Sequence, residues 1–199
     1  MAAGGGVPAA RRIRVLPAAD RAASAWKNGG GTTREVAAGP DGAGLDDFDW
    51  RVSLADVAEG GPFSRFPGVD RVITVVEGNG MELTVDGRPH PVDRRYQPFA
   101  FAGDADTGCR LLDGPIVDFN VMTRRDRVRA TVAIVRDDLA LPSEGTVLVL
   151  LLDGRARLDD SDLDQYDAAL LDGPGSTSLV LNGGAGLAAV VTLRQATRA

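Results

Sequence analysis

Residues 71–87, RVITVVEGNGMELTVDG, contain two short apolar strands separated by a turn that is rich in glycine. Strand candidates of this kind recur along the whole chain, with Gly, Pro and Asp between them at intervals of roughly 8–12 residues. Such spacing is typical of an all-β sandwich or barrel. The pattern leaves room for one short helical turn, in LPAADRAAS at residues 16–24. The sequence therefore predicts an all-β fold.

The arrangement of strand, turn and strand occurs again in the second half of the chain. TVVEG at 74–78 matches LLLDG at 150–154, 76 positions later, and RLLDG at 110–114 matches LVLNG at 179–183, 69 positions later. Asp-Gly turns between short strands also recur by chance, so this observation alone leaves both duplication and coincidence open. Duplication predicts two antiparallel units of similar layout.

Composition and charge exclude several classes of partner. Apolar residues make up 44% of the 199 residues and charged residues 25%, as in ordinary globular proteins. The net charge of −6 and the lack of a long Lys/Arg run argue against nucleic acids and against an anionic membrane surface. No apolar stretch approaches the ~18 residues that a membrane-spanning helix needs. The expected partner is a small molecule.

Cysteine content and the N-terminal segment bear on the compartment. Cys109 is the only cysteine, so no disulfide can form within the chain, and a reducing cytoplasm is the simplest location. Residues 1–12, MAAGGGVPAARR, place their basic residues after small ones and contain no apolar core segment. We therefore expect a mobile tail there and not a signal peptide.

Five ordered segments in the first half carry a family resemblance. They are WKNGGGTTREVA (26–37), LDDFDWRVSLADVAEGGPFSRFPGVDR (45–71), VVEGNGMELTVDG (75–87), PFAFAGD (98–104) and CRLLDGPIVDFNVMTRR (109–125). Together these segments resemble the HutD/Ves family of bicupin proteins. Residues 126–195 are similar to the family only in length and strand character.

The resemblance implies a fold, a biological setting and a ligand class. The fold is two cupin-like jelly-roll barrels in one compact chain, the first over residues 13–120 and a second, smaller one over 121–199, with exchange of strands between the halves allowed. The setting is bacterial histidine utilisation or stress response. For the histidine-utilisation branch, the suspected ligand is N-formylglutamate or a related pathway intermediate.

The residues themselves argue against a metal. Many cupins hold a transition metal with two or three histidines and a carboxylate. This chain has one histidine, His90, between two prolines, where we expect an exposed hairpin connection. Where a metal-binding cupin would carry its ligands, this chain has FSRFPGVDRVITVVEG (63–78), whose arginines repel a cation. We expect no metal and no other cofactor.

Arginine in that segment suggests an anionic ligand, because a guanidinium binds a carboxylate through two parallel hydrogen bonds. In DWRVSLADV, alternation places Arg51 and Ser53 on the same face of a strand. That face either lines a pocket or is solvated, and alternation alone leaves both open. In DFNVMTRR, Asn120 shares a side with Asp118 and Met122, and is either a pocket residue or a buried structural amide.

Two loops provide the remaining candidates. In WKNGGG, three glycines let the backbone approach a ligand or a neighbouring strand, and Lys27 and Asn28 are offered to the pocket. GGPFSRFPGVDR (60–71) has the composition of a structured rim loop, with Phe63 and Phe66 as core anchors. The expected ligand-binding residues are Lys27, Asn28, Arg51, Ser53, Ser64, Arg65, Arg71 and Asn120, with Arg65 and Arg71 as carboxylate clamps.

Three functions remain open at this point. The first is a metal-free protein that senses or governs histidine degradation by binding a small acidic metabolite such as N-formylglutamate. The second is a cofactor-independent isomerase, epimerase or hydrolase that uses Lys27, Glu77 or Asp104 as acid or base. The third is a module that binds a protein partner in a stress response. An exposed flat sheet in each half would also allow a homodimer.

Overall fold

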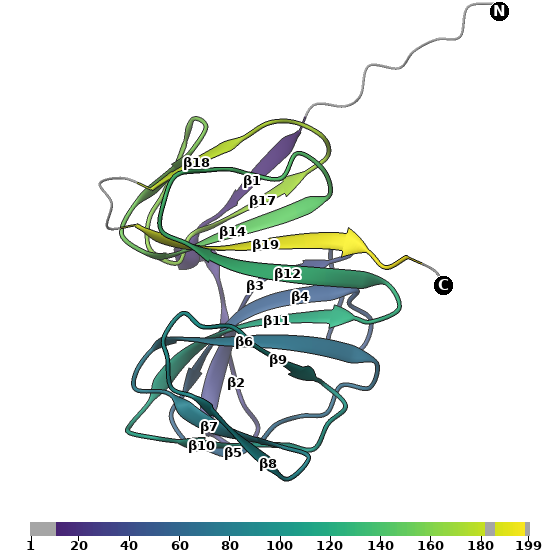
Figure 1. Cartoon of the computed structure of the whole chain (residues 1–199), viewed down its shortest axis with the longest axis vertical. Coiled ribbons are helices and arrows are strands. Elements are labelled where there is room, and N and C mark those ends of the chain that lie inside the picture. Colours follow the sequence, from purple (N-terminus) through teal and green to yellow (C-terminus); the bar gives the residue numbers. More distant parts are fainter. Residues whose placement is uncertain (1–10, 182–185, 198–199) are drawn as a thin grey trace, which may run out of the picture. The chain divides into compact units, whose positions relative to one another are not determined.

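The computed structural model describes residues 11–181 and 186–197 (Figure 1). The described chain is all-β apart from one short 3₁₀ helix, η1 (Ala18–Asp20), which lies inside the segment where a helical turn is expected. None of the described residues forms a helix long and apolar enough to cross a membrane. The chain divides into two compact units. We call residues 19–132 with 195–197 unit I, and residues 11–18 with 133–194 unit II.

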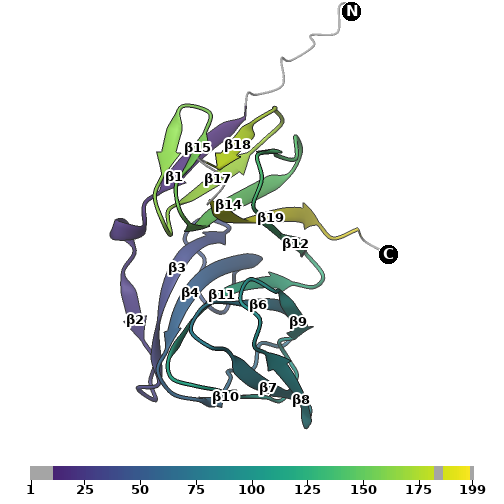
Figure 2. The same cartoon turned by 60° about the vertical axis from the view of Figure 1, so that its left-hand side comes forward.

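Unit I contains a six-stranded and a four-stranded antiparallel sheet, which face each other (Figure 2). The larger sheet has the order β2 (Ala23–Ala25), β3 (Gly31–Gly39), β4 (Trp50–Val57), β11 (Ile116–Arg124), β6 (Val69–Glu77) and β9 (Phe99–Ala102). The smaller sheet has the order β5 (Gly61–Pro62), β10 (Thr107–Leu111), β7 (Met81–Val85) and β8 (Arg88–Val92).

The core of unit I lies between its two sheets. Side chains alternate between the two faces of a strand, so every second residue of a central strand points toward the opposite sheet. Ile73 and Val75 of β6 pack in one cluster with Met81 and Leu83 of β7. Removing apolar surface of this kind from water stabilises a fold by about 25 cal/mol per Å². This packing fixes which face of β4, β6 and β11 looks inward.

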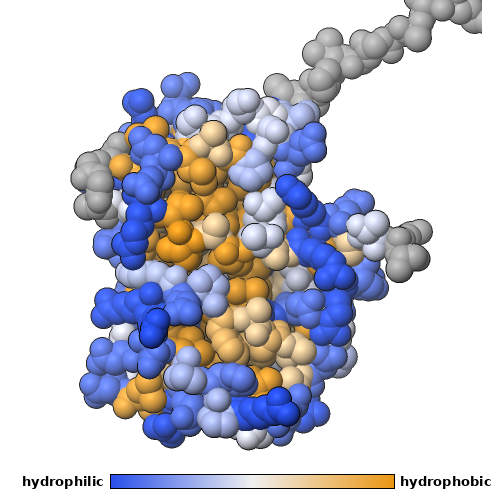
Figure 3. Space-filling view, in the orientation of Figure 1, coloured by the Kyte–Doolittle hydropathy of each residue, from blue (hydrophilic) through white to orange (hydrophobic). Residues whose placement is uncertain are grey.

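Unit II has the same two-sheet construction. One sheet has the order β1 (Arg12–Leu16), β17 (Ala168–Asp172), β14 (Thr146–Asp153), β19 (Leu187–Gln195) and β12 (Val128–Val135). The other has the order β13 (Leu139–Ala140), β18 (Ser178–Leu181), β15 (Ala156–Leu158) and β16 (Ser161–Leu163). Figure 3 shows apolar side chains gathered on one face of unit II. The homodimer remains a prediction.

Units I and II repeat one topology. The order β4-β11-β6-β9 corresponds to β12-β19-β14-β17, and β5-β10-β7-β8 corresponds to β13-β18-β15-β16. The turns repeat as well, because Asp86 and Tyr96 have φ values of 47° and 64°, and Asp159 and Tyr166 have 49° and 66°. Residues other than glycine seldom adopt positive φ. The repeat in the sequence is therefore a repeat of the structure.

The division between the units lies elsewhere than the sequence-based boundary. That boundary, after Asn120, falls inside β11, whereas the units divide after Val132, within β12. The strand β1 belongs to unit II, where it pairs with β17. The expected tail, residues 1–12, lies outside the described residues as far as residue 10, and β1 begins at Arg12. Glycine and proline mark turns in a sequence, and a boundary between units that lies within a strand has neither. The sequence pattern therefore does not predict this boundary.

Gly31, the third glycine of WKNGGG, brings β3 close to β4. A Cβ at this position would overlap the backbone oxygen of Asp56 and lie 3.2 Å from the ring of Trp26. We expect Gly31→Ala to lower the free energy of unfolding by about 1–3 kcal/mol, measured by urea titration. Gly108→Ala is the matched control, since a Cβ there meets no atom within 4 Å. Equal destabilisation by both changes would contradict this close approach.

Candidate functional site

The central strands of unit I carry polar side chains on the face that looks toward the opposite sheet. On β11, Asn120 pairs with Ser53 of β4 on one side and with Ile73 of β6 on the other. One row further along, Met122 pairs with Arg51 and Arg71. One row in the other direction, Asp118 pairs with Ala55 and Val75. We call Arg51, Ser53, Arg71, Asp118 and Asn120 the polar cluster.

Arg71 is a buried cation held by aromatic rings. It is 6% exposed, and its guanidinium carbon lies 4.9 Å from the ring centre of Phe63, 5.0 Å from that of Phe101 and 5.9 Å from that of Phe66. Cation–π contacts of this kind fix the orientation of a guanidinium. The Nε of Arg71 is buried and has no hydrogen-bond partner. Burial lowers the pKa of Arg71 to about 10, with Asp118 opposing this shift, so the side chain stays charged at neutral pH.

Asp118 is a buried carboxyl on the same face of the sheet as Arg71, two rows away, and the charges of the two groups interact. Asp118 is 3% exposed, and its Oδ1 has no hydrogen-bond partner. Burial raises the pKa of Asp118 to about 7, because an ionised carboxylate is poorly solvated in the interior. The charge of Arg71 lowers this pKa, and the nearby Asp56 raises it further. Asp118 therefore changes its charge near neutral pH, while Arg71 does not.

The other members of the polar cluster differ in access and pairing. The side chain of Arg51 is 14% exposed, and its Nε donates a hydrogen bond of 2.8 Å to Oε2 of Glu35, whose side chain is 47% exposed. Ser53 and Asn120 are buried, and the Oδ1 of Asn120 has no partner. The cluster thus reaches solvent on the side of Arg51 and Glu35 and is closed around Asp118.

Four of the eight sequence-predicted site residues come together in this cluster: Arg51, Ser53, Arg71 and Asn120. Asn120 is buried together with Met122, as their shared side of the strand requires. Asp118 is added by the structure. The sequence indicated its position, because alternation puts Asp118 on the same side of the strand as Asn120. The sequence did not indicate its burial, which depends on the opposite sheet.

The other four sequence-predicted residues lie outside the polar cluster. Lys27 and Ser64 are exposed. Asn28 uses its Oδ1 to accept a hydrogen bond of 3.2 Å from the Gly30 amide, which closes the loop before β3. Arg65 forms an exposed ion pair of 3.0 Å with Asp106. Of the two arginines expected to clamp a carboxylate, the structure places only Arg71 in the interior.

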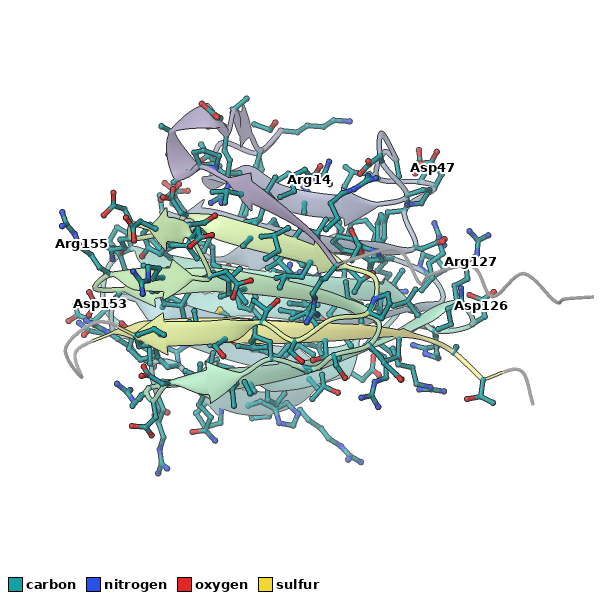
Figure 4. All side chains as sticks on the ribbon, turned by 90° about the horizontal axis from the view of Figure 1, so that it is seen from above. Arg14, Asp47, Asp126, Arg127, Asp153 and Arg155 are labelled. Atoms are coloured by element: carbon teal, nitrogen blue, oxygen red, sulfur yellow. The ribbon has the colours of Figure 1, made fainter. Side chains whose placement is uncertain are left out.

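Charged side chains elsewhere are arranged differently. Figure 4 shows charged side chains that lie near strand ends and point outward, among them Asp126, Arg127, Asp153 and Arg155. An open hollow of about 620 Å³ occurs on the surface of unit I, lined by residues 58–61, 109–111 and 114. None of the polar cluster lines it. The burial of charge, and not this hollow, distinguishes the candidate site.

Unit II provides an internal comparison for the polar cluster. The amide of Tyr96 donates to the Val75 carbonyl at 2.9 Å, and the amide of Tyr166 donates to the Leu151 carbonyl at 2.7 Å. These bonds align Val75 with Leu151. The cross-strand partner of Val75 is Asp118, and the partner of Leu151 is Ala188. The remaining positions of the two sheets follow from these pairings.

The same alignment places apolar residues at the other cluster positions of unit II. The counterparts of Arg71, Asp118 and Asn120 are Val147, Ala188 and Val190, and all three belong to the apolar core of unit II. The topology can therefore be built without polar residues at these positions. Because burying charge destabilises a fold unless it is well compensated, this difference makes the polar cluster of unit I the candidate functional site.

The polar cluster does not fit a transition metal. Such an ion needs several His, Cys, Asp or Glu ligands around one point. Among residues 11–181 and 186–197, no three such side chains gather in this way. His90 lies in β8, half-buried, with its ring tilted against that of Phe99 at a distance of 5.1 Å between ring centres, where the sequence had suggested an exposed loop. The arginines of the cluster suit an anion instead.

Comparison with known proteins gives the family. The HutD family model matches residues 18–189. An uncharacterised 21.2 kDa protein in the hutC 3′ region of Pseudomonas putida is 45% identical over 119 residues, which cover 60% of this chain and 62% of that protein. The chain thus spans less than two thirds of that relative's length. Protein Ves of Citrobacter koseri is 41% identical over 151 residues, with 74% of each chain covered.

Solved structures agree with these matches. HutD from Pseudomonas fluorescens SBW25, solved in a formate condition, has a TM-score of 0.84 at 37% identity, with 94% of this chain and 100% of that chain covered. Two further structures, at 14% and 9% identity, have TM-scores of 0.66 and 0.68. Similarity at such low identity shows the fold alone, which is cupin-like.

Proposed function

Because the chain belongs to the HutD family, we propose that it is a cytoplasmic protein that binds a small acidic metabolite between the sheets of unit I and so senses or governs histidine degradation. The family is linked to histidine utilisation, and a Pseudomonas putida relative is named for its place in the hutC 3′ region. N-formylglutamate, an acylated amino acid with two carboxylates, is the ligand that we place first.

Arg71 is the observation that carries this proposal. It is a buried, charged guanidinium whose Nε has no partner, and Asp118, the buried carboxyl whose charge acts on it, is only partly ionised at neutral pH. A ligand carboxylate would supply the missing negative charge through paired hydrogen bonds. The hydroxyl of Ser53 and the amide of Asn120 offer further polar contacts on the neighbouring strands.

Replacing Arg71 tests the proposal directly. Removing one partner of a buried, charged hydrogen bond costs about 2–5 kcal/mol of binding free energy, so we expect Arg71→Met to weaken binding at least ~30-fold. The measurement is isothermal titration calorimetry with N-formylglutamate, urocanate, glutamate and formate. Arg65→Met is the matched control, because Arg65 is an exposed arginine just before β6, paired with Asp106, and its loss is expected to leave affinity unchanged.

Two results would overturn the binding proposal. One is the absence of saturable binding by any of the four compounds near millimolar concentration. The other is an equal loss of affinity in Arg65→Met and Arg71→Met, which would separate binding from the polar cluster.

An enzymatic role is the second candidate, and Asp118 is the observation that favours it. Carboxyl groups with a pKa near neutral serve as general acids and bases. Lys27, Glu77 and Asp104, the earlier candidates for this chemistry, are exposed. A proton-transfer reaction at the carbon next to a bound carboxylate would exchange deuterium from D₂O into the ligand. Deuterium exchange into the ligand, detected by NMR and lost in Asp118→Asn, favours an enzymatic role. If the native protein shows no exchange, only the binding role remains.

A further inference from the structure

Binding of a carboxylate inside unit I would leave more negative than positive charge in the polar cluster. Arg51 is compensated by Glu35 through their hydrogen bond of 2.8 Å. Arg71 and Asp118 are left as one buried cation and one buried carboxyl. A carboxylate bound at Arg71 would place a second negative group against a single positive one. Like charges in a poorly solvated interior repel strongly, so one of the two carboxyl groups must become neutral.

Asp118 is the group that can become neutral without disturbing the structure. Its Oδ1 makes no hydrogen bond that protonation would break, and the side chain is fully buried. Ala188 occupies the equivalent position of unit II, so neither a charge nor a carboxyl is needed there for packing. The ligand carboxylate, held by a guanidinium, stays ionised.

We propose that Asp118 takes up a proton from solvent when a carboxylate binds at Arg71, and that its O–H then donates a hydrogen bond to the bound anion. This inference rests on the proposed function. In the ligand-free protein the pKa of Asp118 is about 7, and the added negative charge raises it further. Protonation thus turns the interior from a mixed pair of charges into two hydrogen-bond donors, Arg71 and Asp118.

The proposal sets a preference among ligands. Two donors favour a molecule that presents acceptor oxygens and no ammonium group, because neutral Asp118 offers no counter-charge to a cation beside Arg71. An N-acylated amino acid meets this condition, and a free amino acid does not. We expect N-formyl-L-glutamate to bind at least about tenfold more tightly than L-glutamate, a difference of about 1.4 kcal/mol.

The other ionisable groups around Asp118 do not account for proton uptake on ligand binding. They are Arg71 on β6, Arg51 and Asp56 on β4, Glu35 on β3 and Cys109 on β10. Asp56 is paired with Arg34, and burial raises the pKa of Cys109 to about 11, well above the range of interest. His90 lies on β8 of the opposite sheet, where its ring contacts that of Phe99. His90→Gln serves as the control for this side chain.

The experiment counts the protons that accompany binding. N-formyl-L-glutamate is titrated calorimetrically in phosphate and in Tris, which have different ionisation enthalpies, at several pH values. For the native protein we expect uptake of about half a proton near pH 7 and about one near pH 8, with affinity falling about tenfold per pH unit above neutrality. In Asp118→Asn we expect no uptake and the same affinity throughout, and in His90→Gln we expect the native behaviour.

The outcomes separate this inference from the proposed function. Binding without proton uptake, or uptake that persists in Asp118→Asn, overturns the role of Asp118 and leaves anion binding intact. Failure of the native protein to bind N-formyl-L-glutamate, formate or urocanate overturns both. If Asp118→Asn does not fold, Asp118→Ala replaces it, because unit II has alanine at this position.

Discussion

Replacing Arg71, Asp118 and Asn120 together by Met, Val and Val is expected to stabilise unit I and to abolish anion binding. Burial lowers the pKa of Arg71 and raises that of Asp118, so folding disfavours the charged form of each group. Exchanging buried ion pairs for apolar residues of similar size often raises the free energy of unfolding by about 1–4 kcal/mol. Unit II already has apolar residues at all three positions.

Tryptophan fluorescence can follow this effect in unit I alone. The chain has two tryptophans, Trp26 and Trp50, and both lie in unit I. A gain of 1–4 kcal/mol corresponds to a rise of several degrees in Tm, at roughly 2–4 °C per kcal/mol. The matched control is the exposed pair Arg65→Met/Asp106→Val, for which we expect little change. A triple variant that unfolds at lower temperature than the native protein would mean that the cluster supports the fold.

Asp118 is also expected to make the stability of unit I depend on pH. Its pKa is about 7 in the folded protein and about 3.9 in an unfolded chain, so between these values the folded protein keeps a proton that the unfolded chain has lost. The contribution of Asp118 to stability is therefore fully present below about pH 4 and is lost as pH rises to about 7. At about 1.4 kcal/mol per pH unit, the total is about 4 kcal/mol.

The difference between the native protein and Asp118→Asn isolates this contribution, because other groups titrate equally in both. Urea unfolding followed by tryptophan fluorescence should show Asp118→Asn gaining stability relative to the native protein from about pH 4 to about pH 7, with a constant difference above. A constant difference over the whole range would show that Asp118 is ionised in the folded protein, and it would also remove the basis of proton uptake.

Alternation along strands predicted which side chains share a face for three of the five residues of the polar cluster, although it left open which way that face looks. Arg51 and Ser53 lie on β4, and Asn120 lies on β11, where every second side chain faces the same way. Loops have no such period, and there the sequence-based candidates Lys27 and Arg65 proved to be exposed. The structure explains both outcomes, since strand geometry is local and loop geometry depends on what the loop packs against.

Glu35 and Asp118 show what alternation could not predict. The pairing of β3 with β4 is regular from Gly31 to Glu35 and places Glu35 beside Ser53, but alternation within one strand does not tell which residues of two strands pair. The unusual pKa of Asp118 arises from burial, which depends on how the two sheets of unit I pack together. The all-β fold follows from local patterns of residues, but the charge state of a buried carboxyl is a property of the assembled unit.

The pairing of β1 with β17 implies an order of folding during synthesis. Leu16 of β1 pairs with Ala168 of β17, so this first strand has no partner until most of the chain has been made. The strands that carry the polar cluster lie between Trp50 and Arg124 and need no later segment for their pairing. Since domains fold as the chain emerges, the anion site can assemble on the ribosome while β1 still waits for its partner.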